Sequence, residues 1–293
     1  MKLIYEEPVY RPPSEAYSLI IQVTIGCKHN ACSFCGMYRE KRFRIKSWEE
    51  IKADIDYCKI NYLHVRRVFL ADGDALAMES AEIIKILDYL YEVFPGLERI
   101  SMYAGPKDLL AKSPEELKEI HRHGLQILYM GIESGSDIIL KQINKGVTSE
   151  QMIEAGRKAL AAGFVLSATL ILGLGSTERS REHAVESARV ASAINPSYLA
   201  LLTLMIMENA PIYRRIKAGQ FNILTAEQSL AELKMIIENL YLDSCVFRCN
   251  HASNYLPVKG ILNQDKDKLV AMLDSVLKNP QKAKLKPEFL RGL

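Results

Sequence analysis

The 293-residue sequence has no apolar run long enough to cross a membrane, so it predicts no membrane-spanning segment. Its first residues, MKLIYEEPVYRPPSEAYS, contain glutamates and prolines where a signal peptide would need an apolar stretch. The net charge is only +3, so charge alone gives no indication of a nucleic-acid partner. We therefore expect a cytoplasmic protein for which neither a membrane nor a nucleic acid is the predicted partner.

Short repeats and low-complexity segments are also absent, and β-type runs instead alternate with amphipathic helical patterns. The predicted strands span residues 18–25, 67–72, 99–105, 125–133, 164–175 and 197–205. The predicted helices span residues 47–58, 79–94, 113–124, 148–163 and 177–194, and Ser47 with Glu50 forms a capping box at the first of them. Six strands alternating with helices predict an α/β fold with a parallel sheet, which right-handed crossovers would curl into a partial (β/α)6 TIM-like barrel.

The pattern changes after residue 206. Further helices are predicted over 208–219, 225–240 and 265–279, whereas 245–260 is less regular and the basic end of the chain is expected to pack little. These changes divide the chain into an N-terminal extension (1–17), a core barrel (18–206) and a C-terminal α/β extension (207–293) that closes the barrel.

Cysteine is scarce, yet three of the six cysteines fall within nine residues, in GCKHNACSFCGMYR. Their spacing is Cys27-x4-Cys32-x2-Cys35. In a reducing compartment, clustered cysteines hold metal or do chemistry more often than they form disulfides. Thiolates are the ligands of iron–sulfur clusters, and three of them leave one iron open for chemistry. A zinc site with His29 as fourth ligand, or a redox-sensing cysteine group, is the alternative.

Phe34 directly precedes the third cysteine, and with it the segment resembles the radical S-adenosylmethionine (radical SAM) superfamily, whose usual spacing is Cys-x3-Cys-x2-Cys. The first gap is one residue longer here. The resemblance covers residues 18–205 and is to the branch that contains oxygen-independent coproporphyrinogen oxidases and the catalytic domains of methylthiotransferases. It implies that the cysteines hold a [4Fe–4S] cluster, which cleaves S-adenosylmethionine reductively to a 5′-deoxyadenosyl radical that abstracts hydrogen from a substrate. Flavodoxin or ferredoxin as electron donor and an anaerobic host are implied as well.

Three polar or glycine-rich turns follow strands in the predicted barrel, where its active site should lie. The resemblance implies that the Asp-Gly-Asp turn after the second strand binds the methionyl amine, that the Gly-x-Glu-Ser-Gly segment after the fourth contacts the ribose and carboxylate, and that the Gly-x-Gly after the fifth flanks the adenine. The residues expected to contact the cofactor are Phe34, Asp72, Gly73, Asp74, Glu133, Ser134 and Gly173. An ordinary Asp-Gly turn is the alternative for the first segment, and a loop with an N-cap serine is the alternative for the second, for which we favour the cofactor contact.

The segment CVFRCNHASNY (245–255) holds two further thiols, Cys245 and Cys249, and is most simply a buried strand with incidental cysteines. Arg248 and His251 are our candidates for substrate contact. No cobalamin-binding Asp-x-His-x-x-Gly motif is present, and the additional domains of methylthiotransferases are not evident. We therefore expect an oxidoreductase or transferase acting on a small molecule; a zinc-stabilised binding protein and a simple iron–sulfur electron carrier are the other classes.

Overall fold

The computed structural model describes residues 5–292, and the chain divides into two compact units. The first unit comprises Met1–Asn30, Met37–Met130 and Ala155–Leu166, and the second comprises Ala31–Gly36, Gly131–Glu154 and Ser167–Leu293. Residues 1–4 and 293, the outermost parts of the two predicted extensions, lie outside the described residues. Among residues 5–292, no helix combines the length and the apolar character needed to cross a membrane. The domain boundaries after residues 17 and 206 stay predictions.

The main sheet has eight strands, which are mostly parallel and follow the order β1-β4-β5-β6-β7-β8-β9-β10. These strands are β1 (Leu19–Gln22), β4 (Arg67–Ala71), β5 (Arg99–Tyr103), β6 (Leu125–Glu133), β7 (Val165–Leu172), β8 (Tyr198–Thr203), β9 (Cys245–Cys249) and β10 (Val258–Leu262). A small antiparallel sheet pairs β2 (Thr24–Ile25) with β3 (Arg44–Ile45). The α/β class and the TIM-like partial barrel are confirmed; the first predicted strand is divided between β1 and β2.

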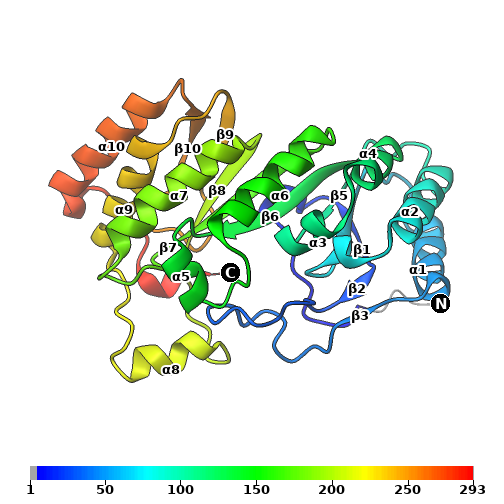
Figure 1. Ribbon diagram of the computed structural model, residues 1–293, viewed down its shortest axis with the longest axis horizontal. Helices are drawn as coiled ribbons and strands as arrows, with labels where there is room; N and C mark the ends of the chain where they lie inside the picture. The colour runs from blue at the N-terminus through cyan, green and yellow to red at the C-terminus, as the bar shows by residue number, and fades with distance from the viewer. Residues whose placement is uncertain (1–4, 293) are drawn as a thin grey trace. The chain divides into compact units, whose positions relative to one another are not determined.

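Helices of the first unit pack in sequence, α1 against α2 and α2 against α4 (Figure 1). Its helical elements are η1 (Pro13–Glu15), α1 (Trp48–Asn61), η2 (Ala75–Ala77), α2 (Ser80–Val93), α3 (Pro106–Ala111) and α4 (Pro114–Arg122). The predicted capping box is present, because the Glu50 amide donates to Ser47 Oγ and the Ser47 amide to the Glu50 carboxylate. α6 (Ser149–Ala161) contributes residues to both units.

Parallel strands of the first unit place aromatic side chains against one another. Phe69, Tyr103 and Tyr129 come from β4, β5 and β6, and their rings meet edge to face with centroids 5.1 to 6.3 Å apart. Edge-to-face pairing adds to the free energy gained from burying the rings. This cluster lies within the apolar interior of the unit.

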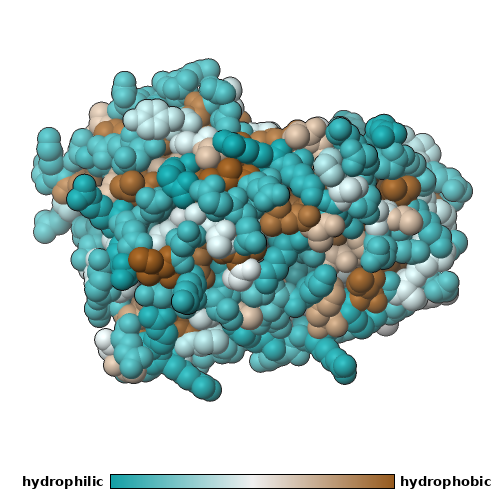
Figure 2. Space-filling view, viewed as in Figure 1, coloured by the Kyte–Doolittle hydropathy of each residue, from teal (hydrophilic) through white to brown (hydrophobic). Residues whose placement is uncertain are grey.

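The second unit packs α7 against α9 and α9 against α10. Its helical elements are α5 (Asp137–Gln142), α7 (Ser180–Ile194), α8 (Pro211–Lys217), α9 (Ala226–Asn239), α10 (Lys266–Lys278), η3 (Pro280–Lys282) and η4 (Glu288–Leu290). Two expectations are corrected here. Residues 245–260, which we expected to be less regular, form an antiparallel hairpin of β9 and β10. The end of the chain, which we expected to pack little, does pack, because the side chain of Arg291 is almost fully buried and donates to the Ser253 carbonyl at 2.8 Å. On the face shown in Figure 2, hydrophobic residues form small patches separated by hydrophilic ones.

A buried carboxylate joins the N-terminal segment to the sheet of the first unit. Glu15 is fully buried, and Arg99 Nη2 donates to its two oxygens at 2.9 and 2.8 Å. Tyr129 Oη also donates to Glu15, at 2.5 Å, and so does the Ser18 hydroxyl. A buried charge is tolerated when it is paired and hydrogen-bonded in this way. Glu15 therefore attaches η1 to β5 and β6.

We predict that Glu15→Met lowers the free energy of unfolding of the apo chain by roughly 3 kcal/mol, because it leaves the Arg99 guanidinium without its counter-ion. Urea denaturation followed by circular dichroism measures the change. Glu92→Met, at an exposed position of α2, is the matched control and should alter stability by no more than about 0.5 kcal/mol. Equal losses in the two variants would contradict a special role for the buried carboxylate.

Candidate active site

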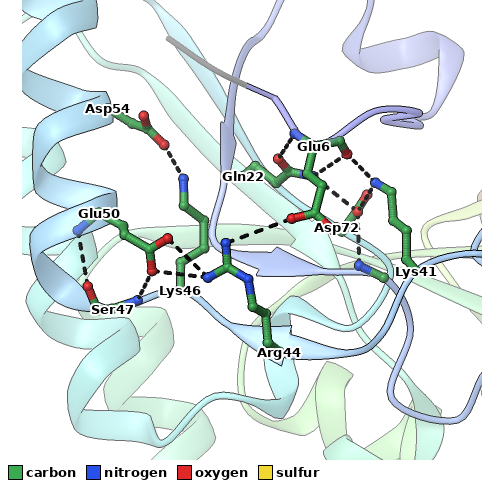
Figure 3. A network of polar contacts seen from close by, with 10 residues as sticks. Glu6, Gln22, Lys41, Arg44, Lys46, Ser47, Glu50, Asp54 and Asp72 are labelled. Atoms are coloured by element: carbon green, nitrogen blue, oxygen red, sulfur yellow. Dashed lines mark hydrogen bonds and ion pairs between the residues drawn. The ribbon is translucent and has the colours of Figure 1, made fainter. Parts of the chain in front are cut away.

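The turn after β4 holds the loop that carries the first cysteine. Asp72 is fully buried, and its Oδ2 accepts from the Gly26 amide at 3.1 Å and pairs with Lys41 Nζ at 2.8 Å (Figure 3). Gln22 Nε2 donates to the same oxygen at 3.2 Å. Asp72 Oδ1 is buried without a hydrogen-bond partner among the described residues. One oxygen thus fixes the loop from within the protein, and the other is an acceptor still able to take a donor.

Asp74 lies at the other end of the same turn and caps the cysteine loop directly. Its Oδ2 accepts from the Lys28 amide at 2.6 Å, from the His29 amide at 3.3 Å and from Cys27 Sγ at 3.3 Å. Burial, followed by the charge of Asp74, raises the pKa of the Cys27 thiol to about 12. Burial, again followed by Asp74, raises the pKa of Asp108. The first unit thus gathers two carboxyl groups around the backbone that presents Cys27.

Gly73, between the two aspartates, has no room for a side chain. A Cβ atom there would lie 2.6 Å from Tyr38 Cε2 and 3.2 Å from Cys27 Cβ. The Gly73 amide also donates to the Gly26 carbonyl at 3.1 Å. The sequence singled out the Asp-Gly-Asp turn, and its glycine is required for close packing against the cysteine loop.

The other two cysteines of the triplet belong to the second unit. Their segment is held by backbone bonds of the Ser33 amide to the Ile143 carbonyl at 2.7 Å and of the Ile212 amide to the Ser33 carbonyl at 2.8 Å. Asn209 Nδ2 donates to the Gly36 carbonyl at 3.0 Å. Asn209 could not be predicted as a site residue, because nothing in the local sequence marks a residue whose partner lies 173 positions away. The segment is therefore fixed from α5 and from the start of α8.

The six cysteines fall into two classes by exposure. Cys27, Cys32 and Cys35 are half-buried, and so is Phe34 between the last two. The remaining three are fully buried: Cys58, Cys245 and Cys249. Within residues 5–292, no group of three or more His, Cys, Asp or Glu side chains is close enough together to hold a metal ion. Cys27 belongs to the first unit, whereas Cys32 and Cys35 belong to the second. The shared ligand role of the triplet stays a prediction.

The turn after β6 carries Glu133 and Ser134. Glu133 adopts a left-handed backbone conformation with φ of 63°, and its Oε1 pairs with Lys145 Nζ at 3.1 Å. Lys145 was not predicted as a site residue, because a lysine twelve residues after an acidic turn is not a recognisable sequence pattern. Ser134 is fully buried with its hydroxyl 2.9 Å from His183 Nδ1. In the turn after β7, the Gly173 amide donates to the Glu232 carboxylate at 2.7 Å.

The two candidates for substrate contact differ in their surroundings. Arg248 is exposed on β9, and its Nη1 donates to the carbonyl of the neighbouring Phe247. His251 is half-buried with Nδ1 2.9 Å from the Ser253 hydroxyl. Burial, followed by the charge of Lys286, lowers the pKa of His251, so its imidazole is neutral at pH 7. Both residues stay candidates.

A model of the radical SAM superfamily matches residues 21–188, more than half of the chain, and the chain therefore belongs to that superfamily. A tRNA-2-methylthio-N(6)-dimethylallyladenosine synthase from Clostridium beijerinckii is 30% identical over 177 residues, which make up 58% of this chain and 38% of the relative. The chain spans between a quarter and about half of the length of the curated relatives it matches.

Two solved structures share the fold. Coproporphyrinogen III oxidase (HemN) from Escherichia coli has a TM-score of 0.57 and 19% identity, covering 75% of this chain and 51% of its own. Methylornithine synthase (PylB) has a TM-score of 0.54 and 16% identity, covering 91% of this chain and 85% of its own. The superfamily named from the sequence is thus confirmed, and proteins of both groups named there, a coproporphyrinogen oxidase and a methylthiotransferase, are similar to this chain.

The predicted class of enzyme and its cofactors, a [4Fe–4S] cluster and S-adenosylmethionine, agree with membership of this superfamily, whose members are enzymes of that kind. The alternatives of a zinc-stabilised binding protein and of a simple electron carrier are not supported by this membership. The chemistry of the residues also suits such a group: Cys27, Cys32 and Cys35 are half-buried cysteines, and an unpaired buried carboxylate oxygen of Asp72 lies in the turn packed against Gly26 and Cys27.

We predict that Gly73→Ala destabilises the apo chain by about 1–3 kcal/mol, because the added methyl group must displace the Tyr38 ring or the Cys27 side chain. The midpoint of urea denaturation reports the loss. Gly96→Ala is the control, since nothing lies within 4 Å of a Cβ at that position. An unchanged midpoint for Gly73→Ala would show that the turn relaxes without cost.

We also predict that the two classes of cysteine react differently with iodoacetamide in the native apo chain. Burial raises the pKa of Cys58 to about 11 and those of Cys245 and Cys249 to about 12, so these thiols should stay unmodified. Cys32 and Cys35 should be modified first, and Cys27 more slowly than these two, because burial and the charge of Asp74 raise its pKa to about 12 as well. Peptide mass spectrometry after timed alkylation measures the order, and equal rates at all positions would contradict it.

Proposed function

We propose that this chain is a radical SAM enzyme whose cluster ligands are Cys27, Cys32 and Cys35 and whose substrate is a small molecule. The observation that carries the proposal is the contrast in exposure: these three cysteines are half-buried, whereas the other three are fully buried. Ligands of an open cluster have to be reachable by the metal and by the cofactor. When bound, the cluster supplies the electron that cleaves S-adenosylmethionine into methionine and a 5′-deoxyadenosyl radical.

The turn after β4 has two tasks in this proposal. Asp72 Oδ2 and Asp74 Oδ2 hold the cysteine loop through the Gly26 and Lys28 amides, so that Cys27 is presented in one conformation. The unpaired Asp72 Oδ1 is an acceptor suited to the methionyl amine, because an ammonium next to a buried carboxylate gains a charge-assisted hydrogen bond. The same side chain would therefore support the loop and contact the cofactor.

The turns after β6 and β7 would take the nucleoside. Glu133 can accept from ribose hydroxyls through the oxygen that is not paired with Lys145. The positive backbone angle of Gly173, with φ of 89°, allows the chain to approach a flat ring closely. Phe34, directly before Cys35, can shield the loop from water.

The substrate and the electron donor complete the proposal. The net charge of +3 gives no indication of a nucleic-acid partner, and we assign the substrate to the class of small molecules. His251, neutral and half-buried, can donate or accept a hydrogen bond with such a substrate. We assign the electron donor to the flavodoxin or ferredoxin class.

We predict that replacing Cys27, Cys32 or Cys35 singly by alanine abolishes both cluster assembly and S-adenosylmethionine cleavage. Iron content and visible absorbance after anaerobic reconstitution measure the first, and 5′-deoxyadenosine formed with dithionite measures the second. Cys245→Ala, which changes a buried thiol outside the triplet, is the matched control and should retain both. A triplet variant that keeps its iron and its activity, or a wild-type chain that binds zinc in place of a cluster, would contradict the proposal.

A further inference from the structure

A fully buried histidine lies between the two turns proposed for the nucleoside. His183 on α7 is 0% exposed, and its Nε2 lies 2.9 Å from the Ile171 carbonyl. A carbonyl only accepts, so Nε2 carries a hydrogen. The Nδ1 atom of His183 lies 2.9 Å from the Ser134 hydroxyl and 3.3 Å from the Ser187 hydroxyl, within hydrogen-bond distance of both.

The two serines also bind backbone amides of the turn after β6. Ser187 Oγ accepts from the Gly135 amide at 2.9 Å, and Ser134 Oγ accepts from the Ser136 amide at 3.2 Å. A Cβ on Gly135 would come within 2.1 Å of the Glu186 carbonyl oxygen, so this turn packs directly on α7. The conformation of the Glu-Ser-Gly turn is therefore set by α7 through His183 and Ser187.

Glu232 on α9 fixes the conformation of the turn after β7 in a similar way, by accepting a hydrogen bond from its backbone. Its carboxylate is 1% exposed; Oε1 accepts from the Gly173 amide at 2.7 Å, and Oε2 accepts from the Ser180 hydroxyl. Oε1 also lies 3.7 Å from His183 Nε2, so the two buried groups are neighbours. Keeping a carboxylate in the interior is costly unless its acceptors are used, and here both oxygens are.

We propose that His183 and Glu232 are positioning residues for the nucleoside part of S-adenosylmethionine. They connect the turn after β6 with the turn after β7 through one buried polar network, and so hold both turns in a binding conformation before the cofactor arrives. Binding to turns that are already ordered avoids the entropy cost of ordering them. Ser134 then acts through His183, to which its hydroxyl is hydrogen-bonded. This inference rests on the proposed function.

The test compares Glu232→Met with Glu232→Gln. Methionine leaves the Gly173 amide without an acceptor, so the turn is no longer held in its binding conformation, and we expect the dissociation constant for S-adenosylmethionine to rise by about tenfold or more. Glutamine retains an oxygen for Gly173 and can donate to Ser180, so it should stay within about threefold of wild type. Equilibrium dialysis with the reconstituted, oxidised holoenzyme, without reductant, measures binding and leaves the cofactor uncleaved.

A second measurement needs neither cluster nor cofactor. Amide hydrogen exchange in the apo chain should accelerate at Gly173 in Glu232→Met, and at Gly135 in Ser187→Ala, which removes the acceptor of that amide. Ser187→Ala is also the milder variant should Glu232→Met fail to fold, and it should likewise weaken S-adenosylmethionine binding. Iron content should equal that of wild type in all of these variants.

Glu15→Met, which removes a buried carboxylate of the first unit, controls for general instability. It should lower the denaturation midpoint and leave the dissociation constant for S-adenosylmethionine unchanged. If Glu232→Met and Ser187→Ala lose stability but bind S-adenosylmethionine as tightly as wild type, the network is structural and the assignment is wrong. A reconstituted wild-type chain that does not bind S-adenosylmethionine would instead overturn the proposed function itself.

Discussion

The ion pair between Asp72 and Lys41 is the interaction on which the cysteine loop depends. Both side chains are almost wholly removed from water, and the ammonium group also donates to the Pro8 carbonyl at 2.6 Å and to the Glu6 carbonyl. A charge buried this deeply is retained only where each donor and acceptor finds a partner. The contact therefore fixes three parts of the chain together: the N-terminal segment, the loop of Cys27 and the end of β4. Loss of either partner would release all three.

The parts of the fold that follow from local patterns could be predicted from the sequence. All six strands of the α/β series were found, and β6 has the predicted limits, because a run of apolar residues bounded by Gly124 and by a polar turn is a strong local signal. The Ser47–Glu50 box was found for the same reason. The cysteine triplet can be recognised without a structure, because it is defined by residue type and spacing alone.

Contacts between distant residues could not be predicted. β9 and β10 pair as a hairpin across the irregular segment 250–257, which has no short turn motif to reveal it. The partners of Glu133 and Gly173, namely Lys145 and Glu232, are ordinary helix or loop residues in the sequence and acquire their roles only when the chain folds. The same holds for the chain end, whose Arg291 stacks on Tyr255 with the guanidinium 4.3 Å from the ring centroid.

The turns chosen from the sequence as cofactor contacts share one property: each is already engaged by a charged or polar partner inside the protein. Lys41 binds Asp72, Lys145 binds Glu133 and Glu232 binds the Gly173 amide. Residues that serve only as ligand contacts would face solvent in the absence of the ligand and would sample several rotamers. Groups held by buried partners lose that freedom when the protein folds, so less entropy remains to be lost on binding. The buried partners thus transfer part of the cost of cofactor recognition from binding to folding.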